Sequence, residues 1–310
     1  MGTKSQSNTI DVSPQQLHNQ RDHSHGLLKV PKKRIDFPSK RAEIFDFLTL
    51  LSQPENLCSP PHEHSFHSTS AESKSTNPQL LRNDETRYLE YYGKESFVDM
   101  QNNEFKCQFP MLMQNQEEIT RHLRASVIDW LFEVGTKLQI DDKGVIFQAI
   151  NLMDRYFDKQ QHSLPSKELQ LTAVTALFVA SKNLEVDPLD LQTCAKTLCF
   201  NKYGRPQFLK RETDIRLATQ YENESPTILD FVMFYIRLIK LQAQKQVDCL
   251  PETQQFISDM TTITYDLCKS VSIDANLFKY RPSILAAALT FIGFQLQFEL
   301  MLSNGQLCTR

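Results

Sequence analysis

The chain has 310 residues, of which 40% are hydrophobic, and a net charge of −3 at pH 7. This length allows one large domain, or two of ordinary size with a tail. The slightly acidic balance argues against a general nucleic-acid binder, which is usually markedly basic. No uninterrupted apolar run reaches the ~18 residues of a membrane-spanning helix. The polar opening MGTKSQSNTIDVSPQQ lacks the apolar core of a secretory signal. We therefore expect neither nucleic acid nor membrane as a partner.

Cysteine and glycine usage bears on redox state and cofactors. The seven cysteines form no CxxC pair, and we interpret them as reduced thiols. Cys194 and Cys199 are interpreted as buried apolar residues rather than redox or metal groups. The eight glycines form neither GxGxxG nor GxxxxGK, so the sequence predicts no phosphate-cradling loop and no cofactor.

Residues 1–84 differ in composition from the rest of the chain. They are dominated by Ser, Asn, Gln, His and Pro with weak periodicity, which predicts a largely disordered tail. The basic cluster KVPKKR, Lys29–Arg34, fits a nuclear import signal, and the alternative is a solvated run of charge. On the first interpretation we expect the protein in both nucleus and cytoplasm. Metal-ligand types occur in CSPPHEHSFH, at Cys58, His62, His64 and His67, but we expect no metal site without surrounding folded structure.

From Glu118 onward, apolar residues recur at steps of three and four. This pattern predicts a helix over 118–138, and Lys143–Phe157 reads as a second. The third segment, KELQLTAVTALFVASK over 167–182, is apolar on nearly every side. It is long, free of Gly and Pro, and rich in Ala and Leu, so it is interpreted as a buried central helix rather than a buried strand.

Two further helices complete this half. Pro188 is interpreted as the first-turn proline of a fourth helix that ends near Cys199. Residues 206–220 suggest a fifth.

A similar succession then begins again. Pro226 and Thr227 open a helix through Ile239, residues 252–270 form another, and PSILAAALTFIGF over 282–294 is a second Ala-rich apolar helix. The two Ala-rich helices lie ~110 residues apart, which indicates a duplicated helical unit larger than a solenoid repeat. The predicted fold class is therefore all-α, with one helix of each half packed inside the others.

These segments resemble the cyclin family, specifically its A- and B-type mitotic members. LRASVIDWLFEV (123–134) is similar to the first helix of the cyclin box, AINLMDRYF (149–157) to the second, and LQLTAVTALFVASK (169–182) to the third. SPTILDF (225–231) is similar to the start of the second cyclin fold. The resemblance implies a five-helix cyclin box over 85–222. A second cyclin-like fold is implied over 223–310, and it looks incomplete because only about twelve residues follow Phe298.

The resemblance also assigns roles to single residues. Five positions that characterise the cyclin box have counterparts in Arg124, Asp154, Leu171, Lys182 and Glu212. Arg124 and Asp154 are implied to pair between the first two helices, and Leu171 to lie in the core. Lys182 and Glu212 are implied to contact a cyclin-dependent kinase beside its mobile regulatory helix. Taken alone, a lysine at a helix end such as Lys182 is a solvated partner of the helix dipole.

In cyclins the first helix lines a shallow groove that docks Arg-x-Leu peptides of substrates and inhibitors. The corresponding positions here are Leu123, Ser126, Val127 and Trp130, with Glu133 and Gln170 as the polar rim. Trp130 would then be half core and half docking floor, and the alternative is a core residue only. Ser126 stands where a large aliphatic residue is usual, which implies a shallower groove. Asn183 and Leu184 replace the usual aromatic and acid after Lys182.

The sequence favours a regulatory subunit that binds and activates a cyclin-dependent kinase in cell-cycle control. One alternative is a transcription-related module of the same fold, TFIIB-like or retinoblastoma pocket-like, which binds DNA or peptides. An enzyme is the third class. Asp129 and Glu133 share one helix face, but they are not accompanied by a convergent nucleophile, base or metal set. No destruction box or KEN sequence is evident in the tail.

Overall fold

A computed structural model describes residues 78–109, 112–222, 224–246 and 251–303. The chain divides into Met1–Ile44 and Phe45–Arg310, and all described residues lie in the second unit. Every regular element in the described ranges is helical, which confirms the all-α prediction. The predicted tail, its Lys29–Arg34 cluster and its Cys/His residues lie outside the described residues up to residue 77.

A long helix that the sequence did not predict precedes the cyclin-like segments. Helix α2 spans Pro78–Asn103, and the 3-10 turn η2 (Glu104–Cys107) follows it. Residues 78–84 are therefore helical, and their assignment to a disordered tail was wrong. The helix is polar along much of its length, so it carries little periodic signal. Phe97 anchors it, because this buried ring stacks on Phe234 at 5.0 Å between centroids.

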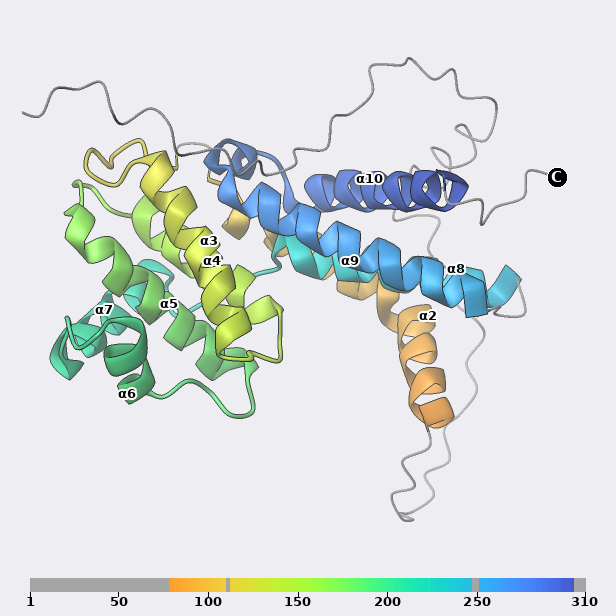
Figure 1. The fold of residues 1–310 in the computed structure, drawn as a ribbon, viewed down its shortest axis with the longest axis horizontal. Coiled ribbons are helices and arrows are strands. Elements are labelled where there is room, and N and C mark those ends of the chain that lie inside the picture. Colours follow the sequence, from red (N-terminus) through yellow and green to blue (C-terminus); the bar gives the residue numbers. More distant parts are fainter. Residues whose placement is uncertain (1–77, 110–111, 223, 247–250, 304–310) are drawn as a thin grey trace, which may run out of the picture. The chain divides into compact units, whose positions relative to one another are not determined.

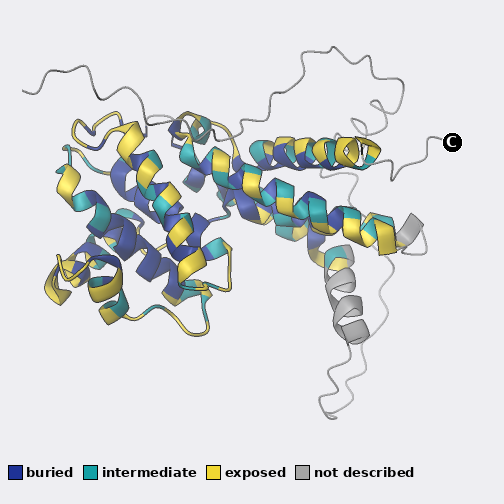
Figure 2. Ribbon diagram, in the orientation of Figure 1, coloured by how far each residue is buried: buried dark blue, intermediate teal, exposed yellow. Residues whose placement is uncertain are grey.

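The first group of helices follows the predicted order. It consists of α3 (Arg121–Lys137), α4 (Gly144–Asp158), α5 (Leu169–Leu184) after the 3-10 turn η3 (Ser166–Glu168), α6 (Leu191–Thr193) with the π-helical turn η4 (Cys194–Leu198), and α7 (Arg205–Ala218). Helix α5 is buried from Leu169 to Ser181 except at Gln170, as expected of a central helix (Figure 2). Its neighbours α3, α4 and α7 pack around it (Figure 1).

Local capping explains where two of these helices begin. The Thr120 hydroxyl accepts a hydrogen bond from the Leu123 amide at 3.2 Å and starts α3. The Asp190 carboxylate accepts one from the Thr193 amide at 2.7 Å and starts α6. Pro188 therefore precedes the helix instead of lying in its first turn, and that prediction was wrong, because the side-chain cap at Asp190 sets the boundary.

The second group contains three long helices. These are α8 (Ile228–Gln246), α9 (Pro251–Ile273) and, after the 3-10 turn η5 (Ala275–Lys279), α10 (Pro282–Ser303). Helix α10 packs against both α8 and α9 (Figure 1). Gly293 permits the close approach to α9, because a Cβ at that position would lie 2.1 Å from the Thr264 hydroxyl oxygen.

Two hydrophobic cores correspond to the two groups. The first joins side chains of α3, α4, α5 and α7, and the second joins Phe97 and Phe147 to α8, α9 and α10. A buried polar contact connects them, since Arg124 Nη1 on α3 donates a hydrogen bond to the Ser272 carbonyl oxygen near the end of α9 at 3.2 Å. Helix α10 is also long and apolar enough to cross a bilayer by length and composition alone, with a mean hydropathy of 1.6 over a window that is 28% buried. Apolar helices in the cores of soluble proteins pass the same criterion.

Candidate functional site

Lys182 and Glu212 meet at one edge of the first helical group. Lys182 lies in the last turn of α5, and its ammonium nitrogen lies 2.5 Å from a Glu212 carboxylate oxygen on α7. The same carboxylate oxygen accepts hydrogen bonds from Nε and Nη2 of Arg216, both at 3.0 Å. Burial alone would raise the pKa of Glu212, but the hydrogen bonds and charges of Lys182 and Arg216 outweigh it and lower that pKa. The carboxylate thus stays ionised between two cations.

Large apolar side chains on α7 and in the segment after α5 are exposed. Leu209 and Leu217 on α7 are 44% and 57% exposed, and Val186, in the segment after α5, is fully exposed. Leu184, two residues past Lys182, is also exposed. Apolar residues around a pair of charged groups are typical of a surface that another protein covers.

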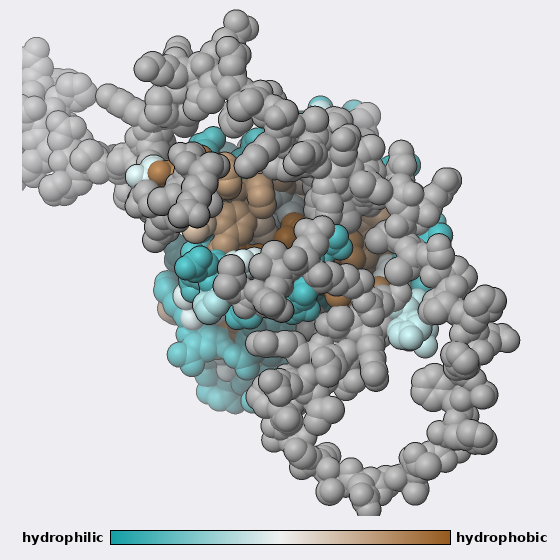
Figure 3. Space-filling model, turned by 90° about the vertical axis from the view of Figure 1, so that its right-hand side faces the viewer, coloured by the Kyte–Doolittle hydropathy of each residue, from teal (hydrophilic) through white to brown (hydrophobic). Residues whose placement is uncertain are grey.

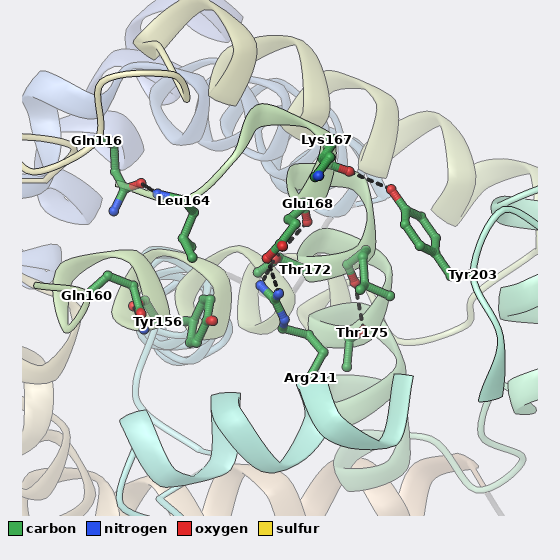
Figure 4. A network of polar contacts seen from close by, with 11 residues as sticks. Gln116, Tyr156, Gln160, Leu164, Lys167, Glu168, Thr172, Thr175, Tyr203 and Arg211 are labelled. Carbon is green, nitrogen blue, oxygen red and sulfur yellow. Dashed lines mark hydrogen bonds and ion pairs between the residues drawn. The ribbon is translucent and has the colours of Figure 1, made fainter. Parts of the chain in front are cut away.

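A buried polar network holds α7 in place against α5 (Figure 4). The Arg211 guanidinium donates to the Thr172 hydroxyl at 2.7 Å and to the Glu168 carboxylate. Its carbon also lies 5.1 Å from the centre of the Tyr156 ring. Because Arg211 directly precedes Glu212, these contacts fix the register at which Glu212 meets Lys182. The sequence reading missed Arg211, and its only signal was its place one residue from an assigned position.

The five positions carried over from the cyclin box fall in two places. Besides the Lys182–Glu212 edge, Arg124 and Asp154 form a fully buried pair through two hydrogen bonds of 2.8 and 2.6 Å. Burial raises the pKa of Asp154, and the Arg124 guanidinium offsets part of that rise. Leu171 is 5% exposed and belongs to the first core. These three residues are thus structural in position.

The predicted docking residues lie on α3 and at the start of α5. Leu123 is 38% exposed and Ser126 is exposed, whereas Val127 and Trp130 are half-buried and pack against the first core. The Gln170 amide donates to the Leu198 carbonyl oxygen at 3.1 Å, so part of its hydrogen-bonding capacity is already used. Trp130 therefore has both a core-facing part and an accessible part.

Glu133 is exposed on α3 and also borders a cleft towards the second helical group. Its carboxylate lies 3.4 Å from the Lys137 ammonium one turn later. Together with Asp129 it lines a cleft of about 660 Å³ between α3 and α9, whose lining also includes Tyr265 and Lys269. Neither Leu123 nor Trp130 lines this cleft.

The described part of the chain was predicted to have neither reactive thiols nor a metal site, and its cysteines and potential metal ligands bear on both predictions. Cys194 and Cys199 are buried, and burial raises their pKa values to about 12 and about 11, so both thiols stay neutral. In that same part, His, Cys, Asp and Glu side chains form no group of three that could hold a metal ion.

Comparison with known proteins finds similarity to cyclins. Residues 95–221 match the cyclin N-terminal domain. The chain is 31% identical over 191 residues to Cyclin-B2-1 of Oryza sativa subsp. japonica, which covers 62% of this chain and 41% of that protein. It is 27% identical over 204 residues to Cyclin-A2 of Xenopus laevis, covering 65% of this chain and 45% of the relative. The chain thus spans less than half the length of these curated relatives.

A solved structure agrees with the fold. A viral cyclin from herpesvirus saimiri superposes with a TM-score of 0.52 at 19% identity, over 64% of this chain and 81% of that one. The described helices therefore form a cyclin fold. Residues 95–221 match the cyclin N-terminal domain, and the relatives that the chain matches are cyclins of the A and B types.

Proposed function

We propose that this protein is a regulatory subunit, not an enzyme, which binds and activates a cyclin-dependent protein kinase in cell-cycle control. The observation that carries the proposal is the partly exposed Lys182–Glu212 ion pair, one helical turn from the exposed Leu209 on α7. The match to a cyclin N-terminal domain and to G2/mitotic-specific cyclins supports it.

The proposed mechanism acts on the regulatory helix of the kinase, which has an inward and an outward position. Apolar contacts from α7 and from the segment after α5 hold the kinase regulatory helix inward. There its glutamate pairs with the lysine that orients the ATP phosphates. The charged groups of Lys182 and Glu212 are already held in place by their mutual hydrogen bond and by Arg216. Binding the kinase therefore costs little side-chain entropy at these two residues.

Substrate recruitment is the second part of the proposal. The accessible side of Leu123, Val127 and Trp130 forms a shallow apolar floor for the leucine of an Arg-x-Leu peptide, and Glu133 accepts its arginine. Ser126 makes this floor shallower than a large aliphatic residue would. We also propose that Lys29–Arg34 directs part of the protein to the nucleus, which replacing its basic residues by alanine in a fluorescent fusion tests directly.

The experiment that tests the main proposal is co-purification from the native cell. The tagged full chain is captured, the bound proteins are identified by mass spectrometry, and protein kinase activity in the eluate is measured. We expect a cyclin-dependent kinase that is active with the wild-type chain and largely missing from a Lys182→Ala/Glu212→Ala capture. Equal recovery of active kinase with both chains would overturn the proposed interface.

A further inference from the structure

The outer side of α10 exposes a row of apolar side chains. Ile284, Ile292, Leu296 and Leu300 are 60%, 40%, 40% and 50% exposed. With exposed Ala288 they recur every four residues and form a ridge along the helix. We call Ile284, Ala288, Ile292, Leu296 and Leu300 the α10 ridge. The exposed side of α10 is visible in Figure 2.

The α10 ridge is nearly free of charge. Glu299 is the only charged residue between Pro282 and Ser303. The opposite side of the helix packs against α8 and α9 through Ala286, Leu289 and Gly293. Hydrophobic side chains also gather on the end of the molecule that faces the viewer in Figure 3. A contiguous ridge of this kind, in contrast to scattered apolar residues, is typical of a surface that binds an apolar and largely uncharged occupant.

The chain itself contains a segment of matching chemistry. Phe45–Leu51, FDFLTLL, lies outside the described residues and has five large apolar residues among seven positions. Asp46 and Thr49 are its two polar residues, three positions apart. On a helix they would share one side and leave a broad apolar face of Phe45, Phe47, Leu48 and Leu51. Elsewhere in residues 1–77 the large apolar residues are more widely scattered.

The connecting chain is long enough for this segment to reach the ridge. Residues Ser52–Asn77 separate it from the start of α2. A flexible linker of that length has a root-mean-square span of about 30 Å and can extend much further. Helix α10, by comparison, is about 33 Å long. Tethering at this range gives a local concentration near millimolar, so the segment outcompetes a second copy of the chain at micromolar concentration.

We propose that Phe45–Leu51 docks on the α10 ridge of its own chain. The interaction goes beyond kinase binding and does not depend on it. Docking places the residues before α2 against the second helical group, on a different element from the Lys182–Glu212 edge. The charge-poor ridge and the charge-poor segment meet without burying an unpaired ion.

Photo-crosslinking of the full chain tests this contact. Benzoylphenylalanine replaces Ile292 on the ridge, and in a matched control it replaces Val186, which is fully exposed in a distant segment. After irradiation at micromolar concentration, proteolysis and mass spectrometry identify the attached peptide. We expect position 292 to crosslink within the chain to the peptide that contains Phe45–Leu51, and position 186 not to do so. Attachment of position 292 to a second copy, or to no peptide of residues 45–51, overturns the proposal.

Hydrogen exchange provides an independent measurement. In Phe47→Ser/Leu50→Ser, exchange of the α10 amides from 292 to 302 is expected to accelerate at least tenfold. The matched variant Leu57→Ser/Phe66→Ser, which changes two apolar residues of the connecting stretch, should exchange as the wild type does. Equal exchange in all three proteins contradicts docking. Flotation of the wild type with phosphatidylcholine vesicles, abolished by Ile292→Ser/Leu296→Ser, would show that lipid is the occupant instead.

Discussion

Arg124 and Asp154 form an ion pair with no exposure to solvent, and the same guanidinium reaches across to the second helical group. Its Nη1 donates to the backbone oxygens of Ser272 and Ile273 at 3.2 and 3.0 Å. The guanidinium carbon also lies 4.9 Å from the centre of the Phe278 ring. Arg124 therefore joins α3, α4 and the end of α9, in addition to the pairing of two helices that the resemblance implied.

The first prediction follows from this burial. Arg124→Ala leaves the buried Asp154 carboxyl and the Ser272 and Ile273 carbonyl oxygens without their hydrogen-bond donor, so we expect a loss of ~3–5 kcal/mol in the free energy of unfolding. Urea denaturation followed by circular dichroism measures it. Arg121→Ala, which removes an exposed arginine one turn earlier, is the matched control, with an expected change under ~1 kcal/mol. An equal loss of unfolding free energy in both variants would mean that the buried pair stabilises the fold no more than an exposed arginine does.

The second prediction concerns the acid dependence of stability. The pKa of Glu212 is lowered in the folded protein from its ordinary value of 4.5. Its contribution to stability is therefore fully present above pH 4.5 and is lost as the pH falls through the lowered folded value. Melting temperatures of wild type and Glu212→Gln, measured between about pH 6 and pH 3, should differ most at pH 6 and converge at low pH. A difference that stays constant across this range would contradict the linkage.

Some helices and site residues could be predicted from the sequence, and others could not. The helices α3, α4 and α5 carry strong three- and four-residue periodicity, and the Lys182–Glu212 positions follow from the resemblance. Helix α2 escaped prediction, because its burial depends chiefly on Phe97 packing against α8, a contact remote in sequence. The orientation of Glu133 towards α9 likewise depends on how the two helical groups meet, which no local pattern encodes.

The third prediction tests the docking floor. Trp130→Ala should weaken binding of an Arg-x-Leu peptide, but it also removes packing from the first core and costs up to ~3 kcal/mol of stability. Ser126→Ile, at an exposed position, should instead strengthen peptide binding about three- to tenfold by adding apolar floor. Fluorescence anisotropy of a labelled peptide measures both. An unchanged affinity in Ser126→Ile would indicate that the peptide does not contact this side of α3.

The fourth prediction separates the acidic rim from the floor. Glu133 is exposed and paired with Lys137 only across one helical turn, so Glu133→Ala should change stability by under ~1 kcal/mol. If the peptide arginine binds this carboxylate, the affinity falls about tenfold in low salt and less in high salt. Lys137→Ala is the informative partner variant. It frees Glu133 from its intramolecular competitor, so peptide affinity should rise slightly. A fall in affinity in Lys137→Ala would place the peptide elsewhere.

The last prediction concerns the edge on which kinase activation depends. Lys182 and Glu212 are partly exposed in the free protein, with side-chain exposures of 32% and 13%, so each alanine variant should lose about 1 kcal/mol or less of stability. On binding, both groups become desolvated against polar groups of the kinase, where losing a charged partner costs ~2–5 kcal/mol. Lys182→Ala and Glu212→Ala should therefore reduce kinase affinity at least tenfold, because ~1.4 kcal/mol already corresponds to that factor. Thr213→Ala, an exposed neighbour on α7, is the control that should bind normally. Calorimetric titration of the kinase with each folded variant decides the matter, and normal affinity of Lys182→Ala/Glu212→Ala would remove this edge from the interface.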